Sequence, residues 1–335
     1  MVMKVASVYF NFANKGGAQK MALDLARLLC DDSDALPVML TSTPLDRIDP
    51  DLRKKANFMT LTLRNLRRLS REGYVVLSHD RRSTTRIMLW HKLQLLKIKV
   101  VHVAHNVFNN LRFATILPRH VVAISTAVRD NLIGYFKLAP ERITLIYNGL
   151  ADLGRCGINN RKDIHIVLAG RICSVKRQVE IARALAGRIP EGVSLCFAGT
   201  GEQADLLAEV VAAEPRMSYA GHLDMSRHIA DFDYVLLFSE KEGLPLTLIE
   251  ACMAGKPMIT NDIRGALDIN IAGETGFVCH DFDGLARLFD RLPEPCSENY
   301  KCLSDNARCR YEECFSVDRM TAQYRSLLEK VVCDK

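Results

Sequence analysis

Residues 234–260 read YVLLFSEKEGLPLTLIEACMAGKPMIT. The apolar run over 234–238 predicts a buried strand, and the shorter run over 257–260 predicts another. Between them, Pro245 suits the first turn of a helix, where its missing N–H would have no partner anyway, so a helix is expected over 246–254. This order of strand, helix and strand predicts a βαβ unit, in which helices cover a parallel sheet.

The same alternation extends through the rest of the chain. A polar segment rich in turn-forming residues, 148–163, interrupts it and predicts a linker. Further strands are expected over 4–10, 74–77, 99–104, 120–124 and 143–146 before the linker, and over 164–169 and 193–198 after it. Further helices are expected over 176–186 and 202–213, and apolar residues at helical spacing predict a packed C-terminal helix over 316–332.

Because the alternation restarts after the linker, the sequence predicts an α/β protein with two Rossmann-like βαβ domains that face a central cleft. The first domain is expected over residues 1–152, with the C-terminal helix 316–333 packing back onto it. The second is expected over residues 160–312. Ligands of such sheets bind beyond the carboxyl ends of the strands, so that is where functional side chains are sought.

The composition is typical of a soluble globular protein. Of 335 residues, 48% are hydrophobic and 25% are charged. No apolar stretch approaches the roughly 18 residues of a membrane-spanning helix, and the segment from Met1 to Phe10 is typical of a first strand rather than a signal peptide. The eleven cysteines match neither a secreted disulfide framework nor a common zinc-ligand spacing, so reduced thiols and a cytoplasmic location are expected.

The charge is distributed unevenly between the two halves. Residues 1–150 contain 23 lysines and arginines against 11 aspartates and glutamates, whereas residues 151–335 contain 22 against 28. The first half therefore predicts an anionic partner, either anionic lipid or a phosphorylated glycan, with a solvated basic face as the alternative. The arginines that would form this surface are Arg64, Arg67, Arg68, Arg71, Arg81, Arg82 and Arg86.

The most informative polar pattern lies in residues 242–250. Glu242 is on the loop after the predicted strand, and the helix start exposes the N–H groups of Leu246 and Thr247, an arrangement that binds phosphate. Glu250 lies one to two turns inside the helix, with its side chain leaning toward the helix start, where a carboxylate accepts both hydroxyls of a ribose. The alternative of solvated surface glutamates is weak for Glu250, because its neighbours are apolar.

Two other strand ends of the second half carry candidate ligand contacts. Arg171 and Lys176 follow the strand over 164–169, and two cations at such a turn bracket a diphosphate. Gly199 and Gly201 form a small-residue turn that lets a ligand approach the backbone. Alone, each pattern is also compatible with ordinary surface residues.

The first half offers two more candidates. Gly16 and Gly17 lie in a loop between a strand and a helix that resembles a phosphate-approach loop, without the spacing of a dinucleotide fingerprint or a P-loop. His105 follows the strand over 99–104 at its carboxyl end. It is a hydrogen-bond partner for a sugar hydroxyl or, equally, an ordinary turn histidine.

Together these motifs resemble the retaining nucleotide-sugar glycosyltransferases of family 4, which adopt the GT-B fold. The matches follow the family's order over almost the whole chain, but Asn148-Gly149 runs into Leu150-Ala151-Asp152 rather than into the family's branched residue and aspartate. The segments that carry the resemblance are Gly16–Ala18, Val122–Ser125 with Val128, Tyr147–Gly149, Gly170–Arg171 with Lys176, Gly199–Gly201, and Glu242–Glu250 followed by Ala251, Ala254–Gly255 and Pro257.

The resemblance implies a role for each matching residue. Arg171 and Lys176 would neutralise the donor diphosphate, and Glu250 would hold the ribose. Glu242 would contact the transferred sugar, and His105 would lie near the sugar and the acceptor. The donor-binding residues carried over in this way are Gly16, Gly17, Gly199, Gly201, Gly243, Leu244, Leu246, Thr247 and Glu250. The resemblance implies no metal and no cofactor; the donor substrate is a UDP-sugar or a GDP-sugar.

The function implied is a retaining, metal-independent hexosyltransferase. It would move a sugar from a nucleotide diphosphate sugar to a hydroxyl of a saccharide or lipid-linked glycan, in cell-surface polysaccharide or lipopolysaccharide biosynthesis, at the inner face of the membrane. A nucleotide-sugar epimerase or hydrolase of the same fold is an alternative. A basic nucleic-acid-binding protein is another, although it offers no role for Glu242 and Glu250.

Overall fold

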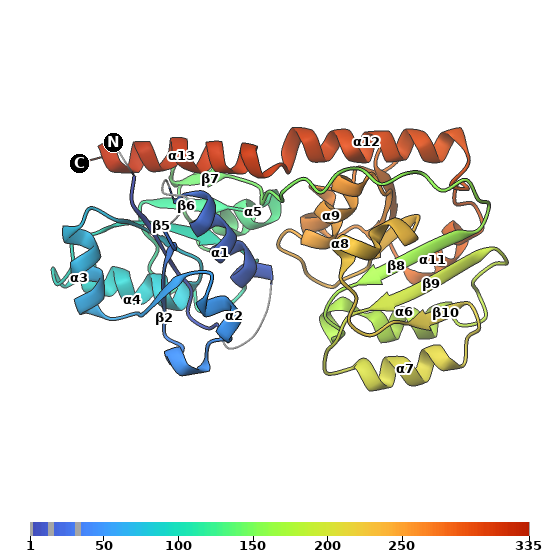
Figure 1. The fold of residues 1–335 in the computed structure, drawn as a ribbon, viewed down its shortest axis with the longest axis horizontal. Coiled ribbons are helices and arrows are strands. Elements are labelled where there is room, and N and C mark those ends of the chain that lie inside the picture. The colour runs from blue at the N-terminus through green and yellow to red at the C-terminus, as the bar shows by residue number, and fades with distance from the viewer. Residues whose placement is uncertain (1–2, 13–16, 31–34, 335) are drawn as a thin grey trace. The chain divides into compact units, whose positions relative to one another are not determined.

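A computed structural model of the chain describes residues 3–12, 17–30 and 35–334, and Figure 1 shows its ribbon. The chain divides into two compact units. Unit 1 comprises Met1–Asn148 and Asp318–Lys335, and unit 2 comprises Gly149–Val317. Each unit is a parallel sheet with alternating helices, which confirms the predicted α/β class with two Rossmann-like sheets.

The described strands of unit 1 form one parallel sheet in the order β3-β2-β1-β4-β5-β6-β7. The chain runs from β1 outward to β3 and then returns to place β4 on the other side of β1. Ligands of such sheets bind at this switch point, here between the carboxyl ends of β1 and β4. The bounds are β1 (Val5–Val8), β2 (Val38–Thr41), β3 (Asn57–Thr60), β4 (Val75–Ser78), β5 (Lys99–Ala104), β6 (His120–Ala123) and β7 (Ile143–Leu145).

Helices cover the sheet of unit 1 on both faces. Successive residues of a strand point to opposite faces, and accordingly Met39 packs with Ala22 and Ala26 of α1, whereas Leu40 packs with Leu66 of α3 and Ile87 of α4. The helical elements are α1 (Gly17–Leu28), η1 (Leu45–Arg47), α2 (Pro50–Arg53), α3 (Leu63–Arg71), α4 (Arg81–Lys92), α5 (Thr126–Gly134), η2 (Pro140–Arg142) and α13 (Val317–Cys333).

The C-terminal helix α13 packs against unit 1 (Figure 1). Its buried face includes Tyr324 and Leu328. Lys99 Nζ donates to the backbone carbonyls of Val331 and Val332 at 2.9 and 2.5 Å. A cation that pairs with the last carbonyls of a helix also complements its dipole, so the last turn of α13 is held at β5.

The described strands of unit 2 form a second parallel sheet in the order β10-β9-β8-β11-β12-β13. Its switch point lies between β8 and β11. The strands are β8 (Ile164–Ala169), β9 (Val193–Ala198), β10 (Met217–Tyr219), β11 (Tyr234–Leu237), β12 (Met258–Asn261) and β13 (Gly276–Cys279). The helical elements are η3 (Ser174–Lys176), α6 (Gln178–Leu185), α7 (Ala204–Ala212), α8 (Met225–His228), η4 (Ile229–Asp231), α9 (Leu246–Ala254), α10 (Arg264–Leu267), α11 (Phe282–Phe289) and α12 (Glu298–Cys314).

Four strands were not expected from the sequence, namely β2, β3, β10 and β13. Each has only three or four residues, and β3 also lacks a buried face because Asn57 and Thr60 are exposed. Such short strands at or near a sheet edge carry little hydrophobic pattern.

The eleven cysteines, all in described parts of the chain, are free thiols. Among the described helices, none combines the length and apolar character needed to cross a membrane.

Candidate active site

The switch point of unit 2 brings two of the predicted site residues together. Lys176 lies in η3 after β8, and Glu242 lies on the loop after β11. Lys176 Nζ is 2.5 Å from Glu242 Oε1, and the two side chains are 24% and 10% exposed. The loop is also tied to η3 through the backbone, because Glu240 N donates to Val175 O at 2.8 Å. The ion pair therefore has a fixed place above adjacent strand ends.

The helix expected over 176–186 begins two residues later, so Lys176 does not open it. Arg177 adopts a left-handed conformation with φ 58° and ψ 25°, which separates η3 from α6. This conformation is uncommon for a residue with a side chain. The Arg177 guanidinium stacks on the rings of Phe282 and Phe238, at 4.5 and 5.7 Å from their centroids. The kink leaves Lys176 in the short turn that faces Glu242.

Gln178 is a site residue that sequence reasoning missed. Its side chain is fully buried, its Nε2 donates to Arg171 O at 2.8 Å, and its Oε1 accepts from Cys173 N at 3.3 Å. Both bonds fold the loop between β8 and η3 back onto the start of α6. No local signal distinguishes this glutamine from a solvated one, because its partners come from the turn that it stabilises.

Arg171 lies on the loop after β8, and the turn of Gly199 and Gly201 lies on the loop after the neighbouring strand β9. Arg171 is exposed and forms no ion pair with a residue that the structure describes. A Cβ at Gly199 would lie 1.8 Å from Gly170 O, and one at Gly201 would lie 2.0 Å from Ile172 O. Because the two loops approach each other so closely, both positions require glycine whether or not a ligand binds. The predicted contact of these glycines with the donor substrate therefore stays a prediction.

The N-terminus of α9 has no side-chain cap. Pro245 is its N-cap residue rather than its first helical residue, and Leu246 and Thr247 open the helix half-buried. Uncapped first-turn N–H groups carry the positive end of the helix dipole and are a binding place for an anion. Glu250 lies in the second turn and is half-buried between the buried residues Ile249 and Ala251.

Gly265 supports the loop that carries Glu242. A Cβ at Gly265 would lie 2.6 Å from Glu242 O and 2.7 Å from Gly243 O. The start of the loop is held by Asn261, whose Nδ2 donates to Ser239 O at 2.7 Å. Gly243 and Leu244 are themselves buried, so the end of β12 and helix α10 support this loop.

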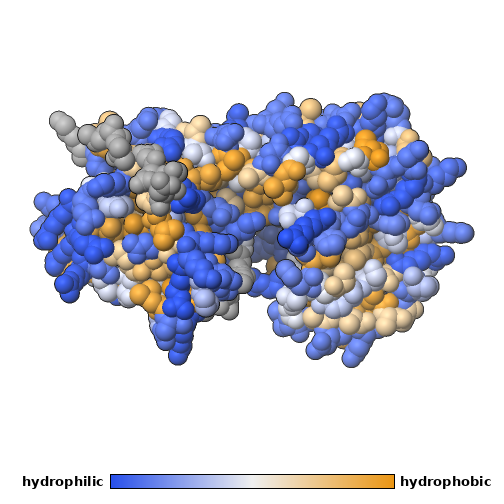
Figure 2. Space-filling model, in the orientation of Figure 1, coloured by the Kyte–Doolittle hydropathy of each residue, from blue (hydrophilic) through white to orange (hydrophobic). Residues whose placement is uncertain are grey.

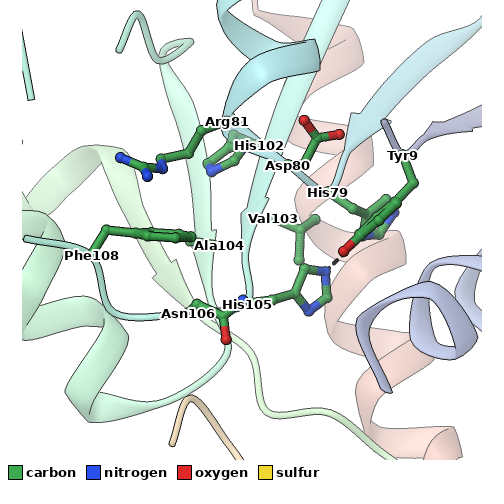
Figure 3. A pocket seen from close by; sticks show the side chains of 10 residues that line it. All are labelled: Tyr9, His79, Asp80, Arg81, His102, Val103, Ala104, His105, Asn106 and Phe108. Atoms are coloured by element: carbon green, nitrogen blue, oxygen red, sulfur yellow. Dashed lines mark hydrogen bonds between the residues drawn. The ribbon is translucent and has the colours of Figure 1, made fainter. Parts of the chain in front are cut away.

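The switch point of unit 1 contains a separate pocket of about 90 Å³, shown in Figure 3. His105, predicted from the sequence, lines it from the end of β5. His79 follows β4 and was not predicted; its Nδ1 lies 2.9 Å from His105 Nε2. The other lining residues are Tyr9, Asp80, Arg81, His102, Val103, Ala104, Asn106 and Phe108.

The histidines of this pocket are neutral at pH 7. Burial lowers the pKa of His105 to about 4 and, with the charge of His105 as a smaller cause, that of His102 to about 3. Burial, followed by the charges of the neighbouring histidines, holds the pKa of His79 well below its usual value. His102 Nδ1 is paired with Thr84 Oγ1 at 2.8 Å, which is consistent with the structural role expected for a histidine inside a strand.

The charged residues of the pocket, Asp80 and Arg81, form hydrogen bonds with neighbouring parts of unit 1. Asp80 accepts from Phe10 N and from Ser83 N, at 2.7 and 2.8 Å, and so caps α4. Burial raises the pKa of its carboxyl, and these hydrogen bonds lower it in part. Arg81 donates to Asn110 O and Oδ1, both at 2.9 Å, and stacks on Phe108 at 3.6 Å. Arg81 is therefore part of the wall rather than of a solvated basic face.

The glycine loop of unit 1 is described only in part. Gly16 lies outside the described residues, and Gly17 is the exposed first residue of α1. In the described part of the chain, no three His, Cys, Asp or Glu side chains come together in a way that could hold a metal ion.

Comparison with known proteins matches both halves of the chain to glycosyltransferase families. Residues 15–152 match the model of Glycosyltransferase Family 4, and residues 163–294 match the model of Glycosyl transferases group 1. The O-antigen biosynthesis glycosyltransferase WbnH of Escherichia coli is 20% identical over 334 residues, which cover 93% of this chain and 96% of WbnH.

Solved structures give the same fold. HepE of Anabaena in complex with UDP has a TM-score of 0.82 at 17% identity, over 98% of this chain and 100% of HepE. The lipopolysaccharide outer core galactosyltransferase WaaB has a TM-score of 0.79 at 18% identity, again over 98% of this chain and 100% of WaaB.

Two doubly wound parallel sheets, matched by HepE and WaaB over 98% of this chain, show the GT-B fold. The chain belongs to the glycosyltransferases of that fold, with a family 4 N-terminal half and a group 1 C-terminal half.

Proposed function

We propose that this glycosyltransferase moves a hexose-type sugar from a nucleotide diphosphate sugar to a hydroxyl of a saccharide or lipid-linked glycan, with retention and without a metal ion. The observation that carries the proposal is the Lys176–Glu242 pair on a loop next to the uncapped start of α9. Solved HepE complexes contain UDP and UDP-glucose, and WbnH acts in O-antigen biosynthesis. Both support a UDP-sugar donor and a cell-surface polysaccharide or lipopolysaccharide product.

The electrostatics of the unit 2 site suit a departing diphosphate. As the bond between the anomeric carbon and the phosphate oxygen breaks, negative charge grows on the diphosphate, and cations held in place stabilise that state more than the ground state. Arg171 is exposed and has no acidic partner among the described residues, so its charge is available to the diphosphate. Lys176 is oriented by Glu242, which makes Glu242 a positioning group as well as a sugar contact.

The acceptor step needs no additional base in this proposal. The acceptor hydroxyl forms the new bond to the anomeric carbon on the face that the diphosphate leaves, and a departing phosphate oxygen takes the hydroxyl proton. In this proposal Glu242 is a binding and electrostatic residue that pairs with Lys176, and not a covalent nucleophile. Retention is therefore expected without a glycosyl-enzyme intermediate.

The donor is tested by binding and by slow hydrolysis. A ligand that binds only the folded protein raises its melting temperature, so UDP, GDP and their sugars are compared in thermal unfolding. Release of UDP from a UDP-sugar, and the anomeric configuration of the product by NMR, then test donor and retention. An epimerase would turn over the donor without an acceptor, and a protein that neither binds nor hydrolyses any of these compounds contradicts the proposal.

Two substitutions test the residue roles. We expect Glu250→Ala to weaken UDP binding by about tenfold, and Lys176→Ala to lower kcat by about tenfold or more with a smaller effect on binding. Glu240→Ala and Lys241→Ala are controls, because both side chains are exposed on the loop that also carries Glu242. Binding and kinetics that match the controls in both variants would contradict the assigned roles.

The proposal also places an anionic partner on unit 1, at the inner face of the cytoplasmic membrane. A hollow of about 740 Å³ on α3 is lined by Arg64, Arg68 and Arg71, with Thr60, Thr62 and Asn65. Figure 2 shows hydrophilic residues gathered over α3. Arg68 is partly engaged by Glu72 at 3.6 Å, whereas Arg64 and Arg71 form no ion pair with a described residue. Guanidinium groups in such a hollow suit phosphate groups of lipid or glycan.

Vesicle flotation tests the membrane part. We expect binding to vesicles that contain anionic lipid, weaker binding at high salt, and loss of binding in an Arg64→Gln, Arg71→Gln variant. Arg183→Gln with Arg287→Gln is the control with the same change in charge, because both arginines are exposed on helices of unit 2. Equal flotation with neutral and anionic vesicles would remove the membrane from the proposal and leave the transferase activity untouched.

A further inference from the structure

Polar side chains from three adjacent strands of unit 1 form a hydrogen-bonded line. Ser7 belongs to β1, His79 follows β4 and His105 follows β5. His79 Nε2 lies 3.4 Å from Ser7 Oγ, and His79 Nδ1 lies 2.9 Å from His105 Nε2. The exposed fractions of Ser7, His79 and His105 are 0%, 3% and 9%. The line therefore runs from the interior of the sheet to the pocket of Figure 3.

Each imidazole in this line carries a single proton at pH 7. Burial lowers the pKa of both histidines far below neutrality. A neutral imidazole holds its proton on Nδ1 or on Nε2, and the bare nitrogen is an acceptor. One proton occupies the contact between His79 Nδ1 and His105 Nε2, so the tautomers of the two rings are coupled and only two arrangements remain.

In the first arrangement, the Ser7 hydroxyl donates to His79 Nε2, His79 Nδ1–H donates to His105 Nε2, and His105 holds its proton on Nδ1. In the second, His105 Nε2–H donates to His79 Nδ1, and His79 Nε2–H donates to Ser7 Oγ. The hydroxyl proton of Ser7 is then left over. Ser7 Oγ has no other hydrogen-bond partner among the residues that the structure describes.

Each arrangement leaves one donor without an acceptor in the described chain, and the two donors differ in burial. In the first arrangement it is His105 Nδ1–H, on a residue that lines the pocket and at an atom that is not fully buried. In the second it is the hydroxyl of Ser7, a residue that is 0% exposed, so that donor is lost to water as well. Such a loss biases an equilibrium by roughly five- to hundredfold. The first arrangement is therefore the favoured one.

We propose that Ser7 and His79 are positioning residues that hold His105 as the Nδ1–H tautomer, so that His105 offers a hydrogen-bond donor to an oxygen of the sugar or phosphate. Figure 3 shows the dashed contact on the edge of the His105 ring that faces His79. Nδ1 has no partner among the described residues. A neutral Nδ1–H cannot accept a proton at that nitrogen, so His105 is a donor and not the general base. The identity of the bound oxygen rests on the proposed function.

The tautomer is measured directly by NMR. Long-range 1H–15N correlation spectra distinguish protonated from bare ring nitrogens, and the signals of His105 and His79 are assigned by their loss in His105→Asn and His79→Asn. In the unliganded protein at pH 7, we expect both rings to be protonated on Nδ1 and bare on Nε2. Protonation of His105 on Nε2, on both nitrogens, or as a mixture of similar populations overturns the proposal. This readout needs no enzyme activity, so it stands or fails apart from the proposed function.

Kinetics then test the consequence for the reaction. His79→Leu removes the donor that holds His105, and His79→Asn supplies an amide N–H near the former Nδ1. We expect His79→Leu to lower kcat about tenfold with little change in KM for the donor, and His79→Asn to restore most of it. His120→Leu is the matched control, because His120 lies outside the pocket and is paired with Asp334 at 2.8 Å. Equal losses in both His79 variants, with unchanged thermal unfolding, overturn the positioning role.

Discussion

Asp233 is a fully buried carboxylate at the start of β11 in unit 2. Its oxygens accept hydrogen bonds from Asn159 Nδ2 at 2.7 Å, from Arg161 Nη2 at 2.9 Å and from His165 N at 2.8 Å. Two of these donors belong to the segment that precedes β8. A buried carboxylate persists only where donors compensate its lost hydration, so Asp233 fastens this segment to the sheet.

We expect Asp233→Asn to lower the free energy of unfolding of unit 2 by about 2–4 kcal/mol, because an amide accepts fewer hydrogen bonds and leaves the Arg161 charge without its partner. Urea unfolding followed by circular dichroism measures this. Asp231→Asn is the control, because that carboxylate is 66% exposed and pairs with His228; it should change stability by less than about 0.5 kcal/mol. Similar stabilities of the two variants would show that the network contributes little.

The loop that carries Glu242 depends on contacts that its own sequence does not reveal. Its predicted neighbours, β11 and α9, have the expected places, and the ranges predicted for β8, β9 and α9 agree with the structure. The loop itself is held by Asn261, the last residue of β12, and by Gly265 of α10. These two residues lie next to the loop only because β12 pairs with β11 in the sheet.

Gly265→Ala tests this support. The new Cβ would meet Glu242 O at 2.6 Å, and a backbone atom cannot move aside without shifting the loop. We expect a destabilisation of about 1–3 kcal/mol and a smaller rise in melting temperature on addition of UDP than in the unchanged protein. Gly134→Ala is the control, because nothing lies within 4 Å of the corresponding Cβ on α5. If Gly265→Ala matches this control, Gly265 does not support the loop.

The buried histidines of unit 1 make its stability depend on pH. Unit 1 holds three buried neutral histidines, and the pKa values of His102 and His105 are lowered to about 3 and about 4. Below the pKa of an unfolded histidine, near 6.5, the unfolded chain binds protons that the folded unit does not. The stability of unit 1 is therefore complete above that pH and is lost progressively as the pH falls toward the folded values. Burial raises the pKa of Asp80, so the folded unit takes up this proton more readily than the unfolded chain, and Asp80 opposes the loss.

We expect the free energy of unfolding of unit 1 to fall by about 2 kcal/mol for each of these histidines between about pH 6.5 and about pH 5. Trp90 is the single tryptophan of the chain and packs against the core of unit 1, so its fluorescence in urea follows this unit alone. His102→Asn should remove a substantial part of the pH dependence. A flat profile over this range would contradict the assignment of buried, neutral rings.

The sequence by itself determined the alternation of strands and helices, the tandem arrangement and the family motif from Glu242 to Glu250, because periodicity, turn residues and helix starts are local properties. It did not reveal β2 or β3, or that α6 begins after a left-handed Arg177. Only the tertiary structure placed His79 beside His105 and Gly265 beneath Glu242. Those contacts depend on strand order: a chain that returns across its sheet makes neighbours of strand ends separated by tens of residues, and no local pattern records which ends will meet.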